Sequence, residues 1–250
     1  MPRRPAYLCL PPQEAIAYFR QKISIPTEKW DQFEAEQHDF AYTVAGLTRA
    51  DLLEALQWLI DGAIADGTSF DDFVSQFRRS IARRGWSPEP LTASKDELKA
   101  SYRMRTLFET PIRRAYGVGR LKQMRDPEML KRRPYWQWKH RDSIVPRPNH
   151  LALHNKVFRA DNPFFDIAFP PAAFGCRCGV FSLSERQLKQ MGLKVEEPPD
   201  PNTIAEKGFR RAPGTTTQRD RKQVLQQGLD RLSPQLKAQV EADLKQRNLL

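Results

Sequence analysis

Apolar residues recur at helical spacing in the first third of the chain. Between positions 52 and 63, leucine, isoleucine and alanine return every three or four residues, which places them on one face of an α-helix. Thr48 followed by Asp51 is the pattern of a helix start with Thr48 as the N-cap residue. Ser69 and Asp72 repeat this pattern ahead of a second apolar series. The sequence therefore predicts a helical N-terminal region.

The pattern changes farther along the chain. Ser94 and Glu97 begin a long basic helix that is predicted to continue past position 120, and Pro111 is expected to kink or split it. Beyond this helix, the short apolar runs at 135–139 and 180–183 are separated by turn residues and predict strands. Together these features predict an α+β fold.

The last part of the chain has a third kind of sequence pattern. Beyond Gly192 the sequence is rich in Pro, Glu, Thr and Gly, which is typical of a linker or an extended arm. A final helix is predicted behind Ser233, with an apolar stripe formed by Leu236, Val240 and Leu244. Such a short helix is not stable alone in water, so we expect it to dock on this chain or on a neighbour.

These sequence patterns divide the chain into three parts. We expect a helical N-terminal region at 1–90, a small α+β module with the long basic helix at 91–192, and a C-terminal arm with helices at 193–250. A globular chain of 250 residues buries about 70% of its unfolded surface, enough for a core without disulfides. No stretch approaches the ~20 apolar residues of a membrane span, so we expect no membrane partner and no secretory signal.

The charge is unevenly distributed. The net charge is +11, yet residues 13–77 hold 4 basic and 12 acidic side chains, whereas residues 78–147 hold 19 basic and 7 acidic ones. A basic block of this size predicts a surface for a polyanion such as double-stranded DNA, bound without regard to sequence. The residues assigned to that surface are Arg113, Arg114, Arg120, Lys122, Lys131, Arg132 and Arg133. The alternative is a solvated face against an acidic protein or against the acidic half of this chain.

Histidines and cysteines form the densest group of candidate ligands. Two histidines at i and i+4, His150 and His154, share one face of a helix, and the Cys176 and Cys178 thiols are separated by a single residue. Together they supply the four nitrogen and sulfur ligands of a tetrahedral Zn²⁺ site. The alternative is that the histidines bond loop carbonyls and the thiols are small buried hydrophobes. Arg147, just before them, is expected to bond loop carbonyls or a carboxylate.

Catalysis has weaker support. Cys176 or Cys178 with His150 could act as a nucleophile and base, and Asp142, Asp161 and Asp166 could form a nuclease site with His150. The aspartates are more typical of turns and caps. The chain has no phosphate-binding glycine loop, serine elbow or His-Glu-x-x-His pair, so we expect no enzyme. Tyr135, Trp136 and Trp138 could stack on single-stranded nucleic acid, but a strand's core face is the favoured interpretation.

Several runs carry a resemblance to a known family. They are RPYWQWKHRD at 133–142, RPNHLALHNKVF at 147–158, DNPFF at 161–165, PP at 170–171 and CRC at 176–178. Together with PPQEAIAYFRQK at 11–22 and FAYTVAG at 40–46, they resemble the phage Mu F-like head morphogenesis family over roughly 11–192. Within this motif, Asp142, Arg147, Pro170 and Pro171 are expected to be structural. Asn155 stands where the family pattern has Gly, a change that a left-handed turn tolerates.

This resemblance implies a role in a tailed phage or prophage. Family members are minor head (capsid) proteins that act in head assembly, DNA packaging or DNA ejection. It implies the portal protein and the major capsid or scaffolding protein as partners. The expected location is the head interior or portal vicinity, with assembly in the bacterial cytoplasm. The rival prediction is a packaging-associated enzyme, a nuclease or Cys-dependent hydrolase.

Overall fold

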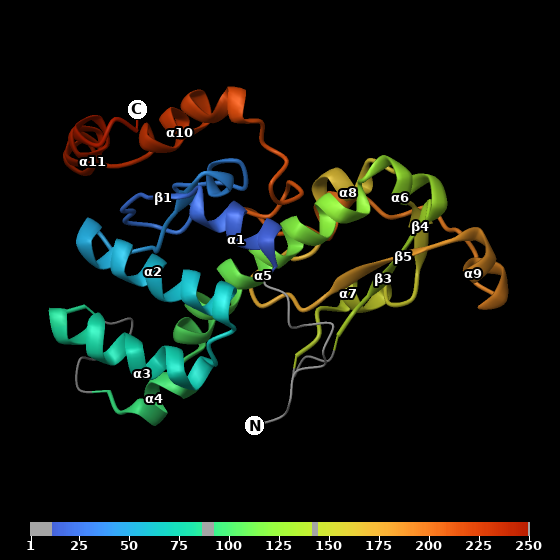
Figure 1. Cartoon of the computed structure of the whole chain (residues 1–250), viewed down its shortest axis with the longest axis horizontal. Coiled ribbons are helices and arrows are strands. Elements are labelled where there is room, and N and C mark those ends of the chain that lie inside the picture. Colours follow the sequence, from blue (N-terminus) through green and yellow to red (C-terminus); the bar gives the residue numbers. More distant parts are fainter. Residues whose placement is uncertain (1–11, 87–92, 142–144, 250) are drawn as a thin grey trace.

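A single long helix, α5 (Tyr102–Met124), connects two groups of elements (Figure 1). The computed structural model describes residues 12–86, 93–141 and 145–249. Its architecture is mixed α+β, as predicted, with many helices and two small sheets. Asp142 lies outside the described residues. Within the described ranges, no helix is both long enough and apolar enough to cross a bilayer.

The first group, here called the helical lobe, surrounds the N-terminal half of α5. Its other elements are α1 (Gln13–Arg20), β1 (Ile23–Ser24), η2 (Gln37–Asp39), β2 (Ala41–Tyr42), α2 (Ala50–Asp66), α3 (Phe70–Ser80), η3 (Ala82–Arg84) and α4 (Lys95–Ala100). Strands β1 and β2 pair in parallel. The apolar positions predicted at 52–63 are buried in one core with side chains of α1, α3 and α5. This confirms the helical N-terminal region.

The helix starts are confirmed at two places and wrong at a third. The Ser69 side chain accepts the Asp72 amide, and Ser94 with Glu97 forms a complete capping box. Thr48 is not an N-cap, because α2 begins one residue later than predicted, behind an extended Arg49.

The long basic helix is interrupted, but not at the predicted position. Ser101 has an extended backbone and its side chain accepts the Met104 amide, so α4 ends there and α5 begins. Pro111 lies inside α5, where it removes one N–H donor from the hydrogen-bond ladder without ending the helix. The split is therefore made by a capping serine and not by the proline.

The second group, here called the sheet lobe, follows α5. Its elements are α6 (Pro127–Arg132), β3 (Tyr135–Lys139), α7 (Pro148–Ala152), β4 (Val157–Arg159), α8 (Phe164–Ile167), β5 (Gly179–Leu183) and α9 (Glu185–Gln190). The predicted strands β3 and β5 pair antiparallel, and β4 pairs with the other edge of β3. Trp136 and Trp138 of β3 are fully buried, and Trp136 packs edge-on to Phe165. The core interpretation of these tryptophans is confirmed.

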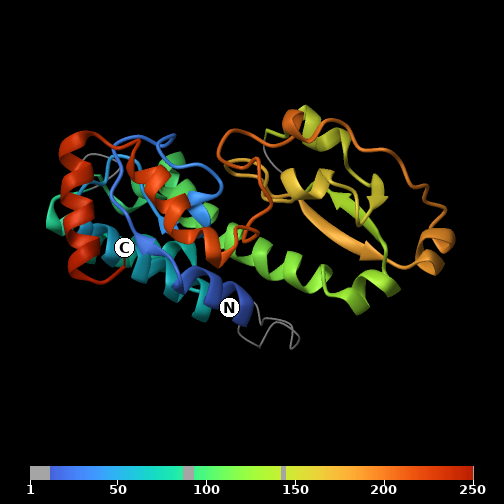
Figure 2. The same cartoon turned by 90° about the horizontal axis from the view of Figure 1, so that it is seen from above.

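The C-terminal arm returns from the sheet lobe to the helical lobe (Figure 2). It contains η4 (Pro201–Thr203), η5 (Gln218–Asp220), α10 (Arg221–Leu229) and α11 (Pro234–Gln246). The apolar stripe of α11 is buried against Ile25 and Phe33 beside β1, so the predicted docking is confirmed and its surface belongs to this chain. The Ser233 side chain donates to Glu28 instead of capping α11. The division at 90 and 192 stays a prediction.

A buried ion pair lies where the helical lobe meets the arm. The Asp39 carboxylate accepts hydrogen bonds from Tyr18 (2.9 Å) and Arg114 (3.3 Å), and also from the Gly214 amide and the Thr216 hydroxyl (both 2.8 Å). Burial opposes ionisation, but the guanidinium and these donors hold the pKa of Asp39 below its ordinary value. Arg114 is 6% exposed, so its assignment to a polyanion-facing surface is wrong.

Candidate metal centre and basic cleft

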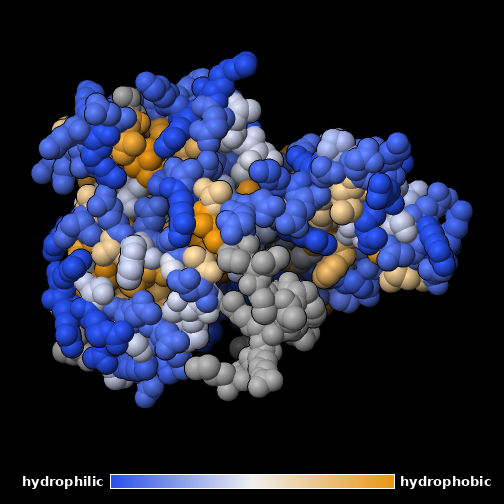
Figure 3. All heavy atoms as spheres, in the orientation of Figure 1, coloured by the Kyte–Doolittle hydropathy of each residue, from blue (hydrophilic) through white to orange (hydrophobic). Residues whose placement is uncertain are grey.

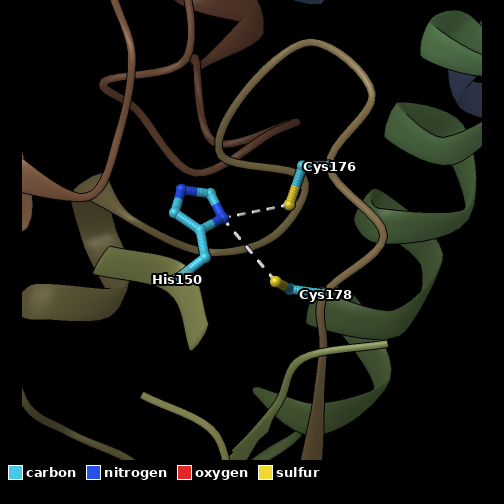
Figure 4. A group of neighbouring side chains, drawn as sticks. All are labelled: His150, Cys176 and Cys178. Atoms are coloured by element: carbon cyan, nitrogen blue, oxygen red, sulfur yellow. Dashed lines mark hydrogen bonds between the residues drawn. The ribbon is translucent and has the colours of Figure 1, made fainter. Parts of the chain in front are cut away.

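Three predicted ligands meet in the sheet lobe (Figure 4). The Nδ1 atom of His150 lies 3.6 Å from the sulfur of Cys176 and 3.6 Å from the sulfur of Cys178. All three ligand atoms lie within 4.8 Å of one another. His150 comes from α7, and the cysteines come from the loop that leads into β5. The structure thus brings three of the four predicted ligands together.

Local sequence explains how the cysteine loop is placed. Pro170 and Pro171 lie against α5 at Gly117, where an added Cβ would be 3.0 Å from the Pro170 oxygen and 3.0 Å from Pro171 Cδ. A side chain at this position would require the proline loop or the helix to shift. Gly175 then turns the chain with a φ of +66°, and Cys176 follows with 4% of its surface exposed.

The hydrogen bonds of His150 define which ring nitrogen faces the sulfurs. Its Nε2 lies 2.9 Å from the carbonyl oxygen of Ile204, so Nε2 carries the proton and Nδ1 presents a lone pair to both thiols. The ring is 2% exposed and packs edge-on against Trp138. The Cys178 thiol and the imidazole hold the pKa of Cys176 well below its ordinary value, and the bond to Cys176, together with burial, raises that of Cys178.

His154 does not join this group. Helix α7 ends at Ala152, so His154 lies in the turn after it and not one helical turn above His150. The side chain is exposed, and its Nδ1 accepts the backbone N–H of His140 at 3.2 Å. Asn155 follows with a φ of +67°, which confirms the expected left-handed turn.

His140 is the neighbour that sequence reasoning missed. It directly follows β3, and its Nδ1 lies 3.4 Å from the sulfur of Cys178. Its Nε2 is buried and has no hydrogen-bond partner among the described residues. No local spacing links position 140 to position 178. The antiparallel pairing of β3 with β5 brings them together, since Lys139 lies opposite Gly179.

Arg147 and the arm hold the loops around the cluster. Arg147 bonds the Glu206 carboxylate (2.8 Å) and the Phe174 carbonyl (2.9 Å), the two kinds of partner predicted for it. Glu206 in turn donates its amide to the Ala172 carbonyl at 2.9 Å. A segment that reads as a linker in the sequence therefore forms one wall of the site.

A basic cleft of about 520 Å³ opens beside the cysteines, between α5 and β5. Its arginines are Arg113, Arg120, Arg141 and Arg177, and its aromatic residues are Phe108, Tyr116, Phe169 and Phe181. Glu109 pairs with Arg113 and Arg177 at 3.2 and 3.3 Å. Arg120 instead lies over the ring of Phe181, and within the described ranges no carboxylate pairs with it. The cleft thus combines positive charge with aromatic surface.

Comparison with known proteins identifies the family of the chain. The model of the family described as "Phage Mu protein F like protein" matches residues 54–181, which include the long helix, the sheet lobe core and the cysteine loop. The chain belongs to this family. The resemblance seen in the sequence is confirmed.

Two relatives of this Mu F-like chain match over much of its length. One is "Putative capsid assembly protein F" of Escherichia phage Mu, 35% identical over 192 residues, which cover 74% of this chain and 43% of the relative. The other is "Mu-like prophage FluMu F protein" of Haemophilus influenzae, 32% identical over 171 residues, which cover 68% of this chain and 41% of the relative. The match spans less than half of each relative's length. No solved structure matches the chain.

The other basic residues of this Mu F-like chain do not form one surface. Lys122 and Arg132 line a separate shallow depression near α6, and Lys131 is exposed nearby. Arg133 donates to the Ser182 carbonyl and hydroxyl. Arg113 and Arg120 are the two predicted residues that line the cleft.

The aspartates proposed for a nuclease have other partners. Asp161 pairs with Arg159 at 2.6 Å, and Asp166 pairs with Arg125. Across the described ranges, the one group of three or more His, Cys, Asp or Glu residues close enough to hold a metal is His150, Cys176 and Cys178. The geometry therefore favours sulfur and nitrogen chemistry at this site over carboxylate chemistry.

Proposed function

We propose that this chain is a minor head protein that acts in head morphogenesis of a tailed phage or prophage. The observation that carries the proposal is the 35% identity over 192 residues to a phage Mu protein named as a capsid assembly protein. The proposed partners are the portal protein and the major capsid or scaffolding protein. The proposed place is the head interior or the portal vicinity, after assembly in the bacterial cytoplasm.

The surface supports contact with other proteins. The face in Figure 3 is largely hydrophilic with small apolar patches. Trp30, Tyr102, Phe174 and Phe209 line a second cavity of about 520 Å³, between the helical lobe, the cysteine loop and the arm. Trp30 is 54% and Tyr102 is 70% exposed, unusual values for large aromatic side chains. Apolar surface of this kind is typical of docking sites on partner proteins.

The basic cleft supports contact with packaged DNA. Arginines without carboxylate partners bind phosphates and release counterions, so affinity falls as salt rises. We predict that Arg120→Ala weakens binding to unrelated DNA sequences by similar factors and lowers the salt slope by about one. Gel shifts over a salt series measure this. The control is Arg114→Lys, which alters a buried arginine that cannot reach DNA. An unchanged slope in Arg120→Ala would contradict the assignment.

The test of the head role is quantitative mass spectrometry of purified heads, before and after DNA release. A few copies in each full head would support a minor structural component, and loss on DNA release would make it a protein that travels with the DNA. Absence from mature heads would remove the structural role and leave an assembly factor or an enzyme.

A Cys-dependent hydrolase is the rival function, supported by one observation. Cys176, with its lowered pKa, lies beside the His150 imidazole and borders the cleft. Cys176→Ala separates the two functions. An enzyme would lose turnover at unchanged melting temperature, whereas a structural residue would lower the melting temperature first.

A further inference from the structure

The cluster in the sheet lobe contains a buried polar atom that the described chain does not satisfy. Two thiols face the Nδ1 lone pair of His150, and Cys178 also lies 3.4 Å from Nδ1 of His140. Nearby, His140 keeps a buried Nε2 without a partner among the described residues. Buried polar groups in folded proteins are normally paired, so this arrangement calls for another participant.

Three of the distances in the cluster match those between ligands of a tetrahedral metal site. A Zn–S bond of about 2.3 Å and a Zn–N bond of about 2.0–2.1 Å, at a tetrahedral angle, separate sulfur and nitrogen by about 3.6 Å. The observed separations are 3.6, 3.6 and 3.4 Å. His150, Cys176 and Cys178 form a group of three ligand atoms within 4.8 Å of one another, and His140, which contacts Cys178 from outside that group, is a further imidazole that can complete the closed donor set that structural zinc prefers.

The surroundings orient the ligands. The Ile204 carbonyl holds His150 in the tautomer whose Nδ1 can bind a metal, and Trp138 packs against the ring at 6.0 Å between centroids. His154 accepts the His140 amide, which fixes the backbone from which the His140 ring projects. Carbonyl and imidazole contacts behind the ligands are characteristic of metal sites.

We propose that His140, His150, Cys176 and Cys178 bind one Zn²⁺, and that His154 is a positioning residue rather than a ligand. The site joins the end of β3, helix α7, the cysteine loop and, through Ile204, the arm. With the His140 ring turned toward the other three ligands, protein side chains would hold all four positions, as in structural zinc sites. Two thiolates balance the charge of the ion, and the thiol protons leave on binding. The proposal does not depend on the head role.

The test uses the full chain, purified under reducing conditions without chelator. We expect about one zinc per chain by elemental analysis, and X-ray absorption showing two sulfurs at about 2.3 Å and two nitrogens at about 2.0–2.1 Å. Co²⁺ alone, added to chelator-treated protein, should give the visible bands of a tetrahedral thiolate site. The absence of both bound zinc and a tetrahedral cobalt spectrum would overturn the site.

Matched histidine variants test which imidazole is the fourth ligand. His140→Ala should change the cobalt spectrum, because water replaces nitrogen, and His140→Cys should restore a tetrahedral spectrum with a third thiolate. His154→Ala should lower affinity by no more than about 10- to 100-fold and keep the wild-type spectrum. The reverse pattern would overturn the assignment. X-ray absorption on the wild type decides the donor set even if a variant does not fold.

Discussion

The two lobes each bury a polar cluster, and the clusters differ in how far the chain satisfies them. In the helical lobe, Asp39 accepts hydrogen bonds from Tyr18, Arg114, Gly214 and Thr216. In the sheet lobe, the buried Nε2 of His140 has no hydrogen-bond partner among the described residues. A saturated network fixes a structure, because a buried charge with all its partners gains nothing from another ligand. A network with an unpaired buried group is suited to bind a ligand such as a metal ion. This contrast indicates that the Asp39 network is structural and that the His/Cys cluster is a binding site.

The largest effect is expected from breaking the saturated network. Asp39→Asn removes the charge that faces Arg114, and an unpaired buried guanidinium costs about 3–5 kcal/mol of the free energy of unfolding. Urea denaturation measures it. Asp161→Asn is the matched control, because Asp161 and Arg159 are more than half exposed and should contribute little. A similar loss in both variants would contradict the importance of burial.

Removing the metal tests the other cluster. A chelator should lower the melting temperature of the wild type by an amount equivalent to about 3 kcal/mol if free zinc stands near a hundred times its dissociation constant. It should have no effect on Cys176→Ser, which already lacks a ligand. Hydrogen exchange should show the loss in β3 and α7 before the helical lobe. A uniform loss over both lobes would mean that the clusters are not independent.

A smaller effect is expected where the cysteine loop meets α5. Gly117→Ala places a methyl group 3.0 Å from both Pro170 and Pro171, and such overpacking costs about 1–3 kcal/mol. Gly62→Ala is the control within a helix, since its nearest neighbour is 4.0 Å away, and it should be neutral or stabilising. Thermal unfolding compares them. Equal stability of the two variants would show that the loop can move away from α5.

The smallest effect is a pH dependence. The pKa of Asp39 in the folded chain lies below the ordinary value of 3.8, so the unfolded chain binds a proton first as pH falls. Its stabilisation is complete above that value and is lost as pH falls through the folded pKa. The difference in stability between wild type and Asp39→Asn should therefore shrink only below about pH 4. A difference that shrinks between pH 7 and 5 would point to another group.

Local patterns in the sequence were reliable where the physical cause is local. The capping serines at 69 and 94, the strands at 135–139 and 180–183, and the α11 stripe depend on neighbours within one or two turns. Some wrong assignments have local causes, since α2 begins one residue later than predicted and α7 ends at Ala152. The helical spacing of His150 and His154 predicts a shared face, but α7 ends at Ala152 before His154 is reached. Others have distant causes. Arg114 is buried against Asp39, a partner that lies 75 residues away in the sequence, so no local pattern indicates its burial. His140 reaches Cys178 only through the pairing of β3 with β5.

The seating of α10 and α11 on β1 has a consequence for the order of folding during synthesis. Gln32 bonds the carbonyl of Arg231, 199 positions later, and Phe33 is covered by side chains of the last two helices. While the ribosome makes the residues between them, Ile25 and Phe33 stay without their cover. A chaperone that binds nascent chains would find its target there, and release would wait until α11 has emerged.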